Sequence, residues 1–236
     1  MVNISINENI KEIERKINEA CKRTNRSRED INLIAVTKTI SVDIISEAIE
    51  LGMTDIGENK VQEITAKYDA LNDYDLTWHM IGHLQSNKVK YIIDKVDLIH
   101  SLDRKSLAKE LNKRAKKIDR VINALVQVNI AEEESKFGLK KEDVMDFLKM
   151  LEGYPYIKVK GLMVMAPYAE ESENVRYVFR DAKALFEKIK KKELSNVEMK
   201  YLSMGMTNDF EIAIEEGANL IRVGTGIFGK RKYKEE

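Results

Sequence analysis

The chain has 236 residues, and its 40 Lys and Arg side chains balance its 40 Asp and Glu side chains, so the formal net charge is zero. This balance excludes the basic excess that a nucleic-acid-binding protein needs. The single cysteine, Cys21, and the lack of an apolar run of membrane-spanning length exclude a disulfide framework and a transmembrane segment. We expect a cytoplasmic protein whose residues 1–236 form one domain, because α/β barrels of this length commonly fold as a single unit.

An amphipathic helix is predicted near the start of the chain. Ile6, Ile10, Ile13 and Ile17 follow spacings of three and four and form one apolar stripe. Cys21 falls on the same stripe, so we interpret it as a small core residue and not as a nucleophile.

The stretch from Ile31 to Lys38 is a short apolar run, rich in β-branched residues, that ends in a lysine. A strand this apolar is typical of a parallel sheet that helices cover on both faces. Lys38 then lies at the carboxyl end of the strand, where α/β folds bind ligands. Partial burial there lowers the pKa of a lysine amine and frees it to attack a carbonyl. The alternative is that Lys38 only marks the end of the strand and reaches solvent.

Strands and helices alternate along the rest of the chain. Eight short strands are predicted, over residues 31–38, 55–59, 78–83, 98–102, 122–130, 159–165, 201–204 and 220–224. Helices are predicted between them, including one over 42–51, one that starts near Ser86 and one over 175–189. Eight strands with intervening helices predict an α/β fold, a single (β/α)8 TIM-type barrel with an extra N-terminal helix. A doubly wound open sheet fits the same alternation, but the even spacing and the count of eight favour a closed barrel.

Two glycine- and hydroxyl-containing loops follow the last two predicted strands, over residues 203–209 and 224–229. Barrel enzymes often hold a phosphate with these two loops, because glycine lets the backbone approach closely and hydroxyls donate to phosphate oxygens. The second loop matches G-x-G-x-x-G, but no acidic residue stands about 20 positions further on, so we discount a dinucleotide fingerprint. The alternative is two ordinary strand-to-helix turns.

Arg222 stands inside the apolar run of the eighth predicted strand. A buried arginine needs partners. Two interpretations remain open at this point: a core ion pair with a carboxylate, or a side chain that points at a ligand from the barrel mouth.

Sequence blocks along nearly the whole chain carry a resemblance to a known family. The blocks are Ala35–Lys38, Gly57–Asn59 with Gln62, Trp78–Lys88, Phe137–Gly138, Gly161–Met163 with Ala166–Pro167, Ser203–Thr207 with Asp209, and Arg222–Thr225 with Phe228–Gly229. With these blocks, the chain resembles the pyridoxal 5′-phosphate homeostasis protein family, which is similar to the barrel domain of alanine racemase. The blocks around Gly82 and Ser203 are the specific ones.

The resemblance implies that pyridoxal 5′-phosphate (PLP) is the cofactor and that Lys38 forms the Schiff base, an internal aldimine, with it. The other cofactor-binding residues that it implies are Asn59 near the ring, Arg222 facing the pyridine nitrogen, and Ser203, Gly205, Thr207, Gly224 and Thr225 around the phosphate. His79, His83 and His100 lack the carboxylate or thiolate pattern of a metal site. We therefore predict no metal, and we interpret these histidines as core or cofactor-wall residues.

An arginine keeps its proton, so a ring nitrogen that Arg222 faces stays unprotonated and the ring is a weaker electron sink. Racemisation needs two bases, and in the racemases the tyrosine that opposes the lysine comes from an added C-terminal domain. Only seven residues follow Gly229 here. We therefore expect this domain and its base to be absent.

These observations favour a PLP carrier in intracellular vitamin B6 homeostasis, with little or no catalytic turnover. We expect a monomer whose partners are PLP and the apo-forms of PLP-dependent enzymes. The first alternative is a PLP-dependent amino-acid racemase with an unrecognised second base. The second alternative is a barrel enzyme that acts on phosphorylated metabolites, with Lys38 forming a Schiff base to the substrate.

Overall fold

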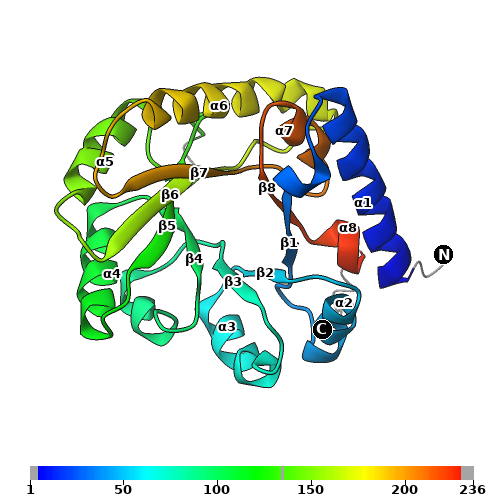
Figure 1. The fold of residues 1–236 in the computed structure, drawn as a ribbon, viewed down its shortest axis with the longest axis horizontal. Coiled ribbons are helices and arrows are strands. Elements are labelled where there is room, and N and C mark those ends of the chain that lie inside the picture. Colours follow the sequence, from blue (N-terminus) through cyan, green and yellow to red (C-terminus); the bar gives the residue numbers. More distant parts are fainter. Residues whose placement is uncertain (1–4, 134–135, 230–236) are drawn as a thin grey trace.

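In the computed structural model, which describes residues 5–133 and 136–229, eight parallel strands close into a barrel in the order of the sequence (Figure 1). The strands are β1 (Asn32–Val36), β2 (Asp55–Glu58), β3 (Thr77–Met80), β4 (Leu98–Leu102), β5 (Ile122–Val128), β6 (Ile157–Val164), β7 (Val197–Ser203) and β8 (Leu220–Val223). The barrel closes where Leu33 of β1 pairs with Ile221 of β8. The expected (β/α)8 barrel is confirmed, and the open sheet is excluded.

Helices surround the barrel (Figure 1). They are α1 (Ile6–Arg23), α2 (Val42–Glu50), α3 (Val61–Lys67), α4 (Lys105–Lys117), α5 (Val144–Leu151), α6 (Arg176–Lys190), α7 (Phe210–Glu215) and α8 (Thr225–Phe228). Short 3₁₀ helices lie at η1 (Arg28–Asp30), η2 (Asp69–Leu71), η3 (Ser86–Tyr91), η4 (Lys141–Asp143) and η5 (Ser172–Val175). The helix expected from Ser86 is thus a 3₁₀ helix. Val89 and the following Ile92 are both fully buried, and their spacing of three suits the three residues per turn of that winding.

The expected N-terminal helix is confirmed as α1, and its boundary has a local cause. The Ser5 hydroxyl accepts the N–H of Glu8 (3.2 Å), and the Glu8 carboxylate accepts the N–H of Ser5 (3.0 Å), which forms a capping box. The isoleucine stripe is buried from Ile10 onward, and Cys21 is buried with it as expected. The helix lies beside α7 and α8, next to the seam between β1 and β8 (Figure 1).

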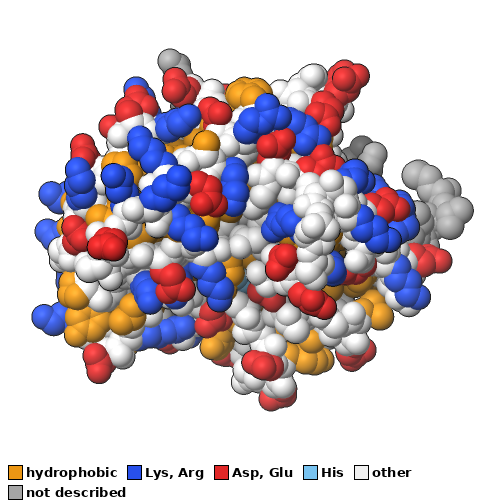
Figure 2. Space-filling model, turned by 45° about the horizontal axis from the view of Figure 1, so that its top comes forward, with side chains coloured by type: hydrophobic (Ala, Val, Ile, Leu, Met, Phe, Trp, Pro, Cys, Tyr) orange, Lys and Arg blue, Asp and Glu red, His pale blue; other side chains and the backbone are white. Residues whose placement is uncertain are grey.

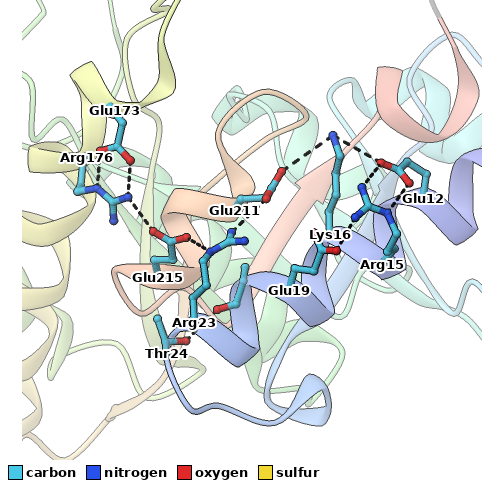
Figure 3. A network of polar contacts seen from close by, with 11 residues as sticks. Glu12, Arg15, Lys16, Glu19, Arg23, Thr24, Glu173, Arg176, Glu211 and Glu215 are labelled. Carbon is cyan, nitrogen blue, oxygen red and sulfur yellow. Dashed lines mark hydrogen bonds and ion pairs between the residues drawn. The ribbon is translucent and has the colours of Figure 1, made fainter.

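Ion pairs fasten α1 to α7 and α7 to α6 (Figure 3). Arg23 of α1 bonds Glu211 (3.1 Å) and Glu215 (2.5 Å) of α7. Arg176 of α6 reaches the same Glu215 (2.7 Å) and also pairs with Glu173 (2.6 Å). Single exposed pairs contribute about 0–1 kcal/mol, but a network that shares one half-buried carboxylate fixes geometry as well. The network therefore anchors α7, the helix that follows the loop after β7.

Side chains on the strands alternate between the interior of the barrel and the surrounding helices. The interior holds a small apolar cluster that the strands build from Ile34, Leu98, Leu125, Met163 and Leu220. The larger apolar cluster lies outside the strands, between the barrel and the helices. Inward-facing positions that follow the interior cluster along each strand therefore reach the carboxyl end of the barrel.

Lysine and arginine side chains intermingle with aspartate and glutamate over the face shown in Figure 2. This distribution agrees with the balanced net charge of the sequence. Within the described ranges, no helix combines the length and the apolar character that crossing a membrane requires.

Candidate functional site

A cavity of about 740 Å³ opens at the carboxyl end of the barrel strands. The structure brings six of the eight cofactor-binding residues expected from the sequence together in its wall: Lys38, Asn59, Thr207, Arg222, Gly224 and Thr225. Ser203 and Gly205 lie outside the cavity wall, next to Arg222. This is the end of the barrel at which (β/α)8 enzymes place their sites.

Lys38 follows the last residue of β1 by two positions and is partly buried in the cavity wall. Ile34 belongs to the apolar cluster inside the barrel, and Val36 lines the cavity beyond it. Lys38 continues this period of two, so the strand itself directs the side chain inward. Thr37 faces the other way, towards β2 and α3, where its hydroxyl donates to Glu58 Oε1 (2.7 Å).

A buried ion pair on the outer side of the barrel holds the backbone before Lys38. The Lys67 ammonium of α3 donates to the carbonyl oxygen of Thr37 (2.9 Å) and to Glu58 Oε1 (2.7 Å). The Glu58 side chain is fully buried, and this burial raises the pKa of Glu58 in spite of the bonds from Lys67 and Thr37. The pair thus fixes the position at which the strand delivers its lysine.

The backbone after Lys38 is held by the same group. Lys67 also donates to Glu63 Oε2 (3.0 Å), and this oxygen accepts the N–H of Thr39 (2.5 Å). Thr39 has a φ of 65°, in the left-handed region that non-glycine residues rarely adopt. The residues on both sides of Lys38 are therefore fastened to one ammonium group.

Arg222 lines the cavity from β8 and is almost fully buried. Its Nη1 donates to Ser203 Oγ (2.6 Å), and its Nη2 donates to the carbonyl oxygen of Val164 (3.0 Å). Burial lowers the pKa of Arg222 to about 10, and the nearby Asp209 carboxylate acts in the opposite direction. Arg222 therefore stays charged at neutral pH. Of the two interpretations from the sequence, the structure favours a side chain directed at a ligand, because both hydrogen bonds go to neutral groups.

Ser203 and Gly205 contact Arg222 and not the cavity. The Ser203 hydroxyl is fully buried and bonds His100 Nδ1 (3.1 Å) as well as the guanidinium. The carbonyl oxygen of Gly205 accepts the backbone N–H of Arg222 (3.0 Å). A Cβ at Gly205 would lie 2.6 Å from the Cβ of Ala213, and the residue has a φ of 91°, so the position requires glycine. These contacts act on the cavity through Arg222.

The loops after β7 and β8 meet at one side of the cavity, where Thr207, Gly224 and Thr225 form the wall. Thr207 Oγ1 accepts the backbone N–H of Gly226 (3.2 Å), which joins the two loops. A Cβ at Gly226 would lie 3.2 Å from Thr207 Cγ2 of the other loop, so glycine at this position lets the two loops approach closely. The two threonine hydroxyls are suitable donors for a phosphate or another anion at this side.

Asn59 follows β2 and lies in the wall under the chain that follows β3. A Cβ at Gly82 would lie 2.3 Å from the carbonyl oxygen of Asn59 and 2.8 Å from its Cα. Glycine at this position lets the two loops cross in contact. The packing of Gly82 on the backbone therefore positions the Asn59 side chain.

Two further wall residues were not among the eight cofactor-binding residues expected from the sequence. His83 and Phe137 line the cavity, with stacked rings 3.9 Å apart at an interplanar angle of 20°. Burial lowers the pKa of His83, and the charge of Arg104 adds to this effect. Two of the recognised blocks contained these residues, but the loops that carry them meet only in the closed barrel. His83 fits the expected wall role, and His79 and His100 are buried in the interior as expected.

Asp209 also lines the cavity and closes the loop after β7. Its Oδ1 accepts the N–H of Met206 (2.6 Å). Burial raises the pKa of Asp209, whereas the Met206 N–H and the Arg222 charge oppose that change. The sequence signal was present, because an aspartate six residues after Ser203 belongs to one of the recognised blocks.

Among the residues that the structure describes, the charged ones in the wall are three cations, Lys38, Lys136 and Arg222, and one carboxylate, Asp209. A positive excess inside a cavity of a neutral protein favours an anionic ligand. In the described part of the chain, no group of three or more His, Cys, Asp and Glu side chains is arranged to hold a metal ion. The site therefore offers the amine of Lys38 as a nucleophile and groups that can donate hydrogen bonds to an anion.

Comparison with known proteins agrees with this geometry. Residues 8–232 match the family described as alanine racemase, N-terminal domain. The chain is 45% identical to a pyridoxal phosphate homeostasis protein from Aquifex aeolicus over 226 residues, which are 96% of this chain and 98% of that protein. It is similar to PipY from Synechococcus elongatus, solved with PLP bound, with a TM-score of 0.79 and 32% identity over 91% of this chain and 100% of that one.

More distant structures share the fold alone. Alanine racemase from Clostridium difficile has a TM-score of 0.68 and 14% identity, and the match covers 94% of this chain and 57% of the racemase. The 45% identity to the Aquifex aeolicus protein over nearly the full length of both chains, together with the family match, decides the assignment. The chain belongs to the pyridoxal phosphate homeostasis protein family, whose barrel is that of the alanine racemase N-terminal domain.

Proposed function

We propose that this protein binds PLP covalently through Lys38 and takes part in intracellular PLP homeostasis as a carrier with little or no turnover. The observation that carries the proposal is that Lys38 and Arg222 enter one cavity from paired strands, β1 and β8. A lysine amine is the nucleophile that condenses with an aldehyde, and a charged arginine donates to a ring nitrogen. The name of the Aquifex aeolicus relative and the PLP-bound PipY structure support this proposal.

The residues present fit the cofactor. A cavity of about 740 Å³ lies within the usual range for small-molecule sites, and its cations favour an anion. In this proposal, Thr207, Gly224 and Thr225 hold the phosphate and Asn59 lies near the ring. Arg222 faces the ring nitrogen, with Ser203 and Gly205 behind it. The supporting observation is that the Thr207 hydroxyl joins the loop after β7 to the loop after β8, and these two loops form the proposed phosphate site.

The carrier role rests on Arg222. Bound PLP supplies an aldehyde and an electron-accepting ring, and a guanidinium with a pKa of about 10 does not give that ring nitrogen a stable proton at neutral pH. A racemase also needs a second base opposite its lysine. Tyr168 lines the cavity, but it is 83% exposed and lacks the burial that would fix its hydroxyl opposite Lys38. The contacts therefore favour retention of the cofactor over turnover.

The test of covalent binding is reduction of the purified protein with borohydride after addition of PLP. We expect a yellow protein whose colour is lost on reduction, with the cofactor fixed to Lys38 in the mass spectrum. Lys38→Arg should abolish the adduct, and Lys60→Arg, on the exposed residue after Asn59, should leave it unchanged. An adduct on another lysine would contradict the assignment to Lys38. A protein that stays colourless with added PLP would contradict the proposal and favour a site for phosphorylated metabolites.

The racemase alternative is tested with L-alanine and added PLP in deuterium oxide, by following the α-proton by NMR. Loss of one general base costs about 10²–10⁴-fold, and a median enzyme turns over about ten times per second. We therefore expect exchange well below one per second and no D-alanine. Rapid exchange with inversion would overturn the carrier role.

The proposal extends to the setting of the protein. We propose that residues 1–236 are one PLP-binding domain, that it is a monomer in the cytoplasm, and that its partners are apo-forms of PLP-dependent enzymes. The single cysteine, Cys21, is buried and unpaired, which suits a reducing compartment. Light scattering tests the monomer, and recovery of activity by an apo-enzyme mixed with the loaded protein tests transfer.

A further inference from the structure

The interior of the barrel holds a continuous series of hydrogen bonds between the cavity and the amino-terminal end of β2. Its links are Arg222 Nη1 to Ser203 Oγ (2.6 Å), Ser203 Oγ to His100 Nδ1 (3.1 Å), His100 Nε2 to His79 Nδ1 (3.0 Å), and His79 Nε2 to Asp55 Oδ1 (3.0 Å). We call these five residues the Asp55–Arg222 chain. They come from β8, β7, β4, β3 and β2, so the series crosses the inside of the barrel.

The three middle residues of the Asp55–Arg222 chain are buried. Ser203 and His100 are fully buried, and His79 is 3% exposed. Asp55 is the first residue of β2, and its side chain is 24% exposed, so the series ends near solvent. Buried polar groups persist in an apolar interior only when their donors and acceptors are matched.

The order of donors and acceptors follows from the residue at each end. A guanidinium only donates, so Ser203 Oγ accepts from Arg222. The one Ser203 proton then goes to His100 Nδ1, which leaves the proton of that ring on Nε2. His100 Nε2–H donates to His79 Nδ1, and His79 Nε2–H donates to the Asp55 carboxylate. Each link then has one donor and one acceptor, and every proton points from the cation towards the anion.

The opposite order fails at the serine. If His100 carried its proton on Nδ1, Ser203 Oγ would accept from both neighbours and its own proton would have no partner within the chain. A neutral His100 agrees with its surroundings, because burial holds its pKa well below the usual value and the charge of Arg222 acts in the same direction. The geometry thus selects one tautomer for each ring.

The Asp55–Arg222 chain connects the buried guanidinium of Arg222 to a carboxylate. Both hydrogen bonds of the guanidinium go to neutral groups. In the sheet, Ile34 of β1 pairs with Asp55 on one side and with Arg222 on the other, and its side chain belongs to the interior apolar cluster. The two charges are therefore linked through aligned dipoles, and such alignment strengthens each bond in the series.

We propose that the Asp55–Arg222 chain orients the guanidinium and balances its charge, so that His79 and His100 are positioning residues for the cofactor site. This inference rests on the proposed function, because it assigns the effect to the ring nitrogen of PLP. A carboxylate at the base of the barrel then sets how strongly Arg222 donates in the cavity. Neither histidine is among the residues that line the cavity.

The first experiment uses the cofactor-free protein and does not depend on PLP. The sequence has three histidines, so long-range ¹H–¹⁵N correlation spectra of histidine-labelled protein contain three rings. We expect the spectra to show the proton on Nε2 and none on Nδ1 in both His79 and His100. His83, which stands outside the series, serves as the reference ring. A proton on Nδ1 of either interior ring would overturn the proposed order.

The second experiment asks whether the series reaches the cofactor. Asp55→Asn keeps an acceptor for His79 but removes the charge, and we expect it to shift the absorption maximum of bound PLP. Asp97→Asn is the matched control, because Asp97 accepts the N–H of Trp78 (2.8 Å) near the same end of the barrel, outside the series. Equal spectra for the two variants would overturn the link to the cofactor.

Two substitutions of His100 distinguish a role of its hydrogen bonds from a role of its packing. A glutamine amide has one acceptor and donors, as the neutral ring has, whereas leucine has neither. We expect His100→Gln to retain PLP like the parent and His100→Leu to lose it at least tenfold faster. Equal retention by both would overturn the proposal. If the parent protein bound no PLP, the proposed function would fail while the tautomer result would still decide the order of the series.

Discussion

The Lys67 ammonium donates a 2.9 Å hydrogen bond to the carbonyl oxygen of Thr37, the residue immediately before Lys38. It also neutralises Glu58, whose side chain is fully buried and whose Oε2 has no hydrogen-bond partner within the described ranges. The ion pair between Lys67 and Glu58, outside the barrel wall, thus contacts the backbone next to Lys38, the lysine proposed to bind the cofactor. The loss of either partner should therefore affect both stability and the site.

Lys67→Met should destabilise the protein by about 3–5 kcal/mol, because it leaves the Glu58 carboxyl buried without its partner. The double variant Lys67→Met with Glu58→Gln should recover much of this loss, since it removes the stranded charge. Urea unfolding of the parent, both single variants and the double variant measures the coupling. Lys60→Met, on an exposed side chain, is the control. Additive losses in the double variant would contradict a coupled pair.

The proposed phosphate site is tested at the hydroxyls of Thr207 and Thr225. Thr225→Val and Thr207→Val each remove one donor to a charged group, a change of about 1.5–3 kcal/mol, which is about tenfold or more in Kd. We expect weaker retention of PLP and little change for pyridoxal, which lacks the phosphate. Equilibrium dialysis with both ligands compares them. Equal losses for the two ligands would show that these hydroxyls do not contact phosphate.

Gly82→Ala should displace the loop that carries Asn59, because the new Cβ would lie 2.3 Å from the Asn59 carbonyl oxygen. Overpacking of this kind costs about 1–3 kcal/mol. Gly153→Ala is the matched control, since its Cβ would lie 3.5 Å from the nearest oxygen, that of Met150. Thermal unfolding and PLP retention measure both variants. A Gly82→Ala protein as stable as the control would mean that the two loops move apart easily.

Acid should destabilise the protein through His100. Burial holds the pKa of this ring well below 6.5 in the folded protein, so the unfolded chain binds the extra proton between the two values. The contribution of His100 is fully present above about pH 6.5 and is lost as the pH falls, by up to about 1.4 kcal/mol per pH unit. His100→Gln should flatten the curve of unfolding free energy between pH 6.5 and 5. His83→Gln, on a more exposed ring, should flatten it less, and identical curves for His100→Gln and the parent would contradict this origin.

The barrel could be predicted from the sequence because its signals are local. β1 is an apolar run, whereas β7 alternates apolar and polar residues. Eight segments of these two kinds, separated by helical stretches, identify the architecture without any knowledge of long-range contacts. The winding at Ser86–Tyr91 differed from the expected helix, since the choice between α and 3₁₀ depends on how Val89 and Ile92 pack against the barrel. Local pattern does not contain that information.

The site was predictable in part for a similar reason. Lys38 and Arg222 follow from strand direction and from the recognised blocks, and both line the cavity. The position of Ser203 behind Arg222 depends on which neighbour its hydroxyl meets across the barrel. The bond between Ser203 and His100 joins residues 103 positions apart, and no spacing rule in the sequence indicates such a contact.

The contact between α1 and α8 has a consequence for folding during synthesis. The Asn9 side chain donates to the carbonyl oxygen of Ile227 (2.9 Å), a residue 218 positions later in the chain. Pairing of β1 with β8 is similarly non-local, and such contacts form late because their loop-closure entropy is large. During synthesis, Lys38 therefore leaves the ribosome long before Arg222, the residue of β8 that lines the same cavity. The complete cavity forms only when translation of the barrel is nearly finished.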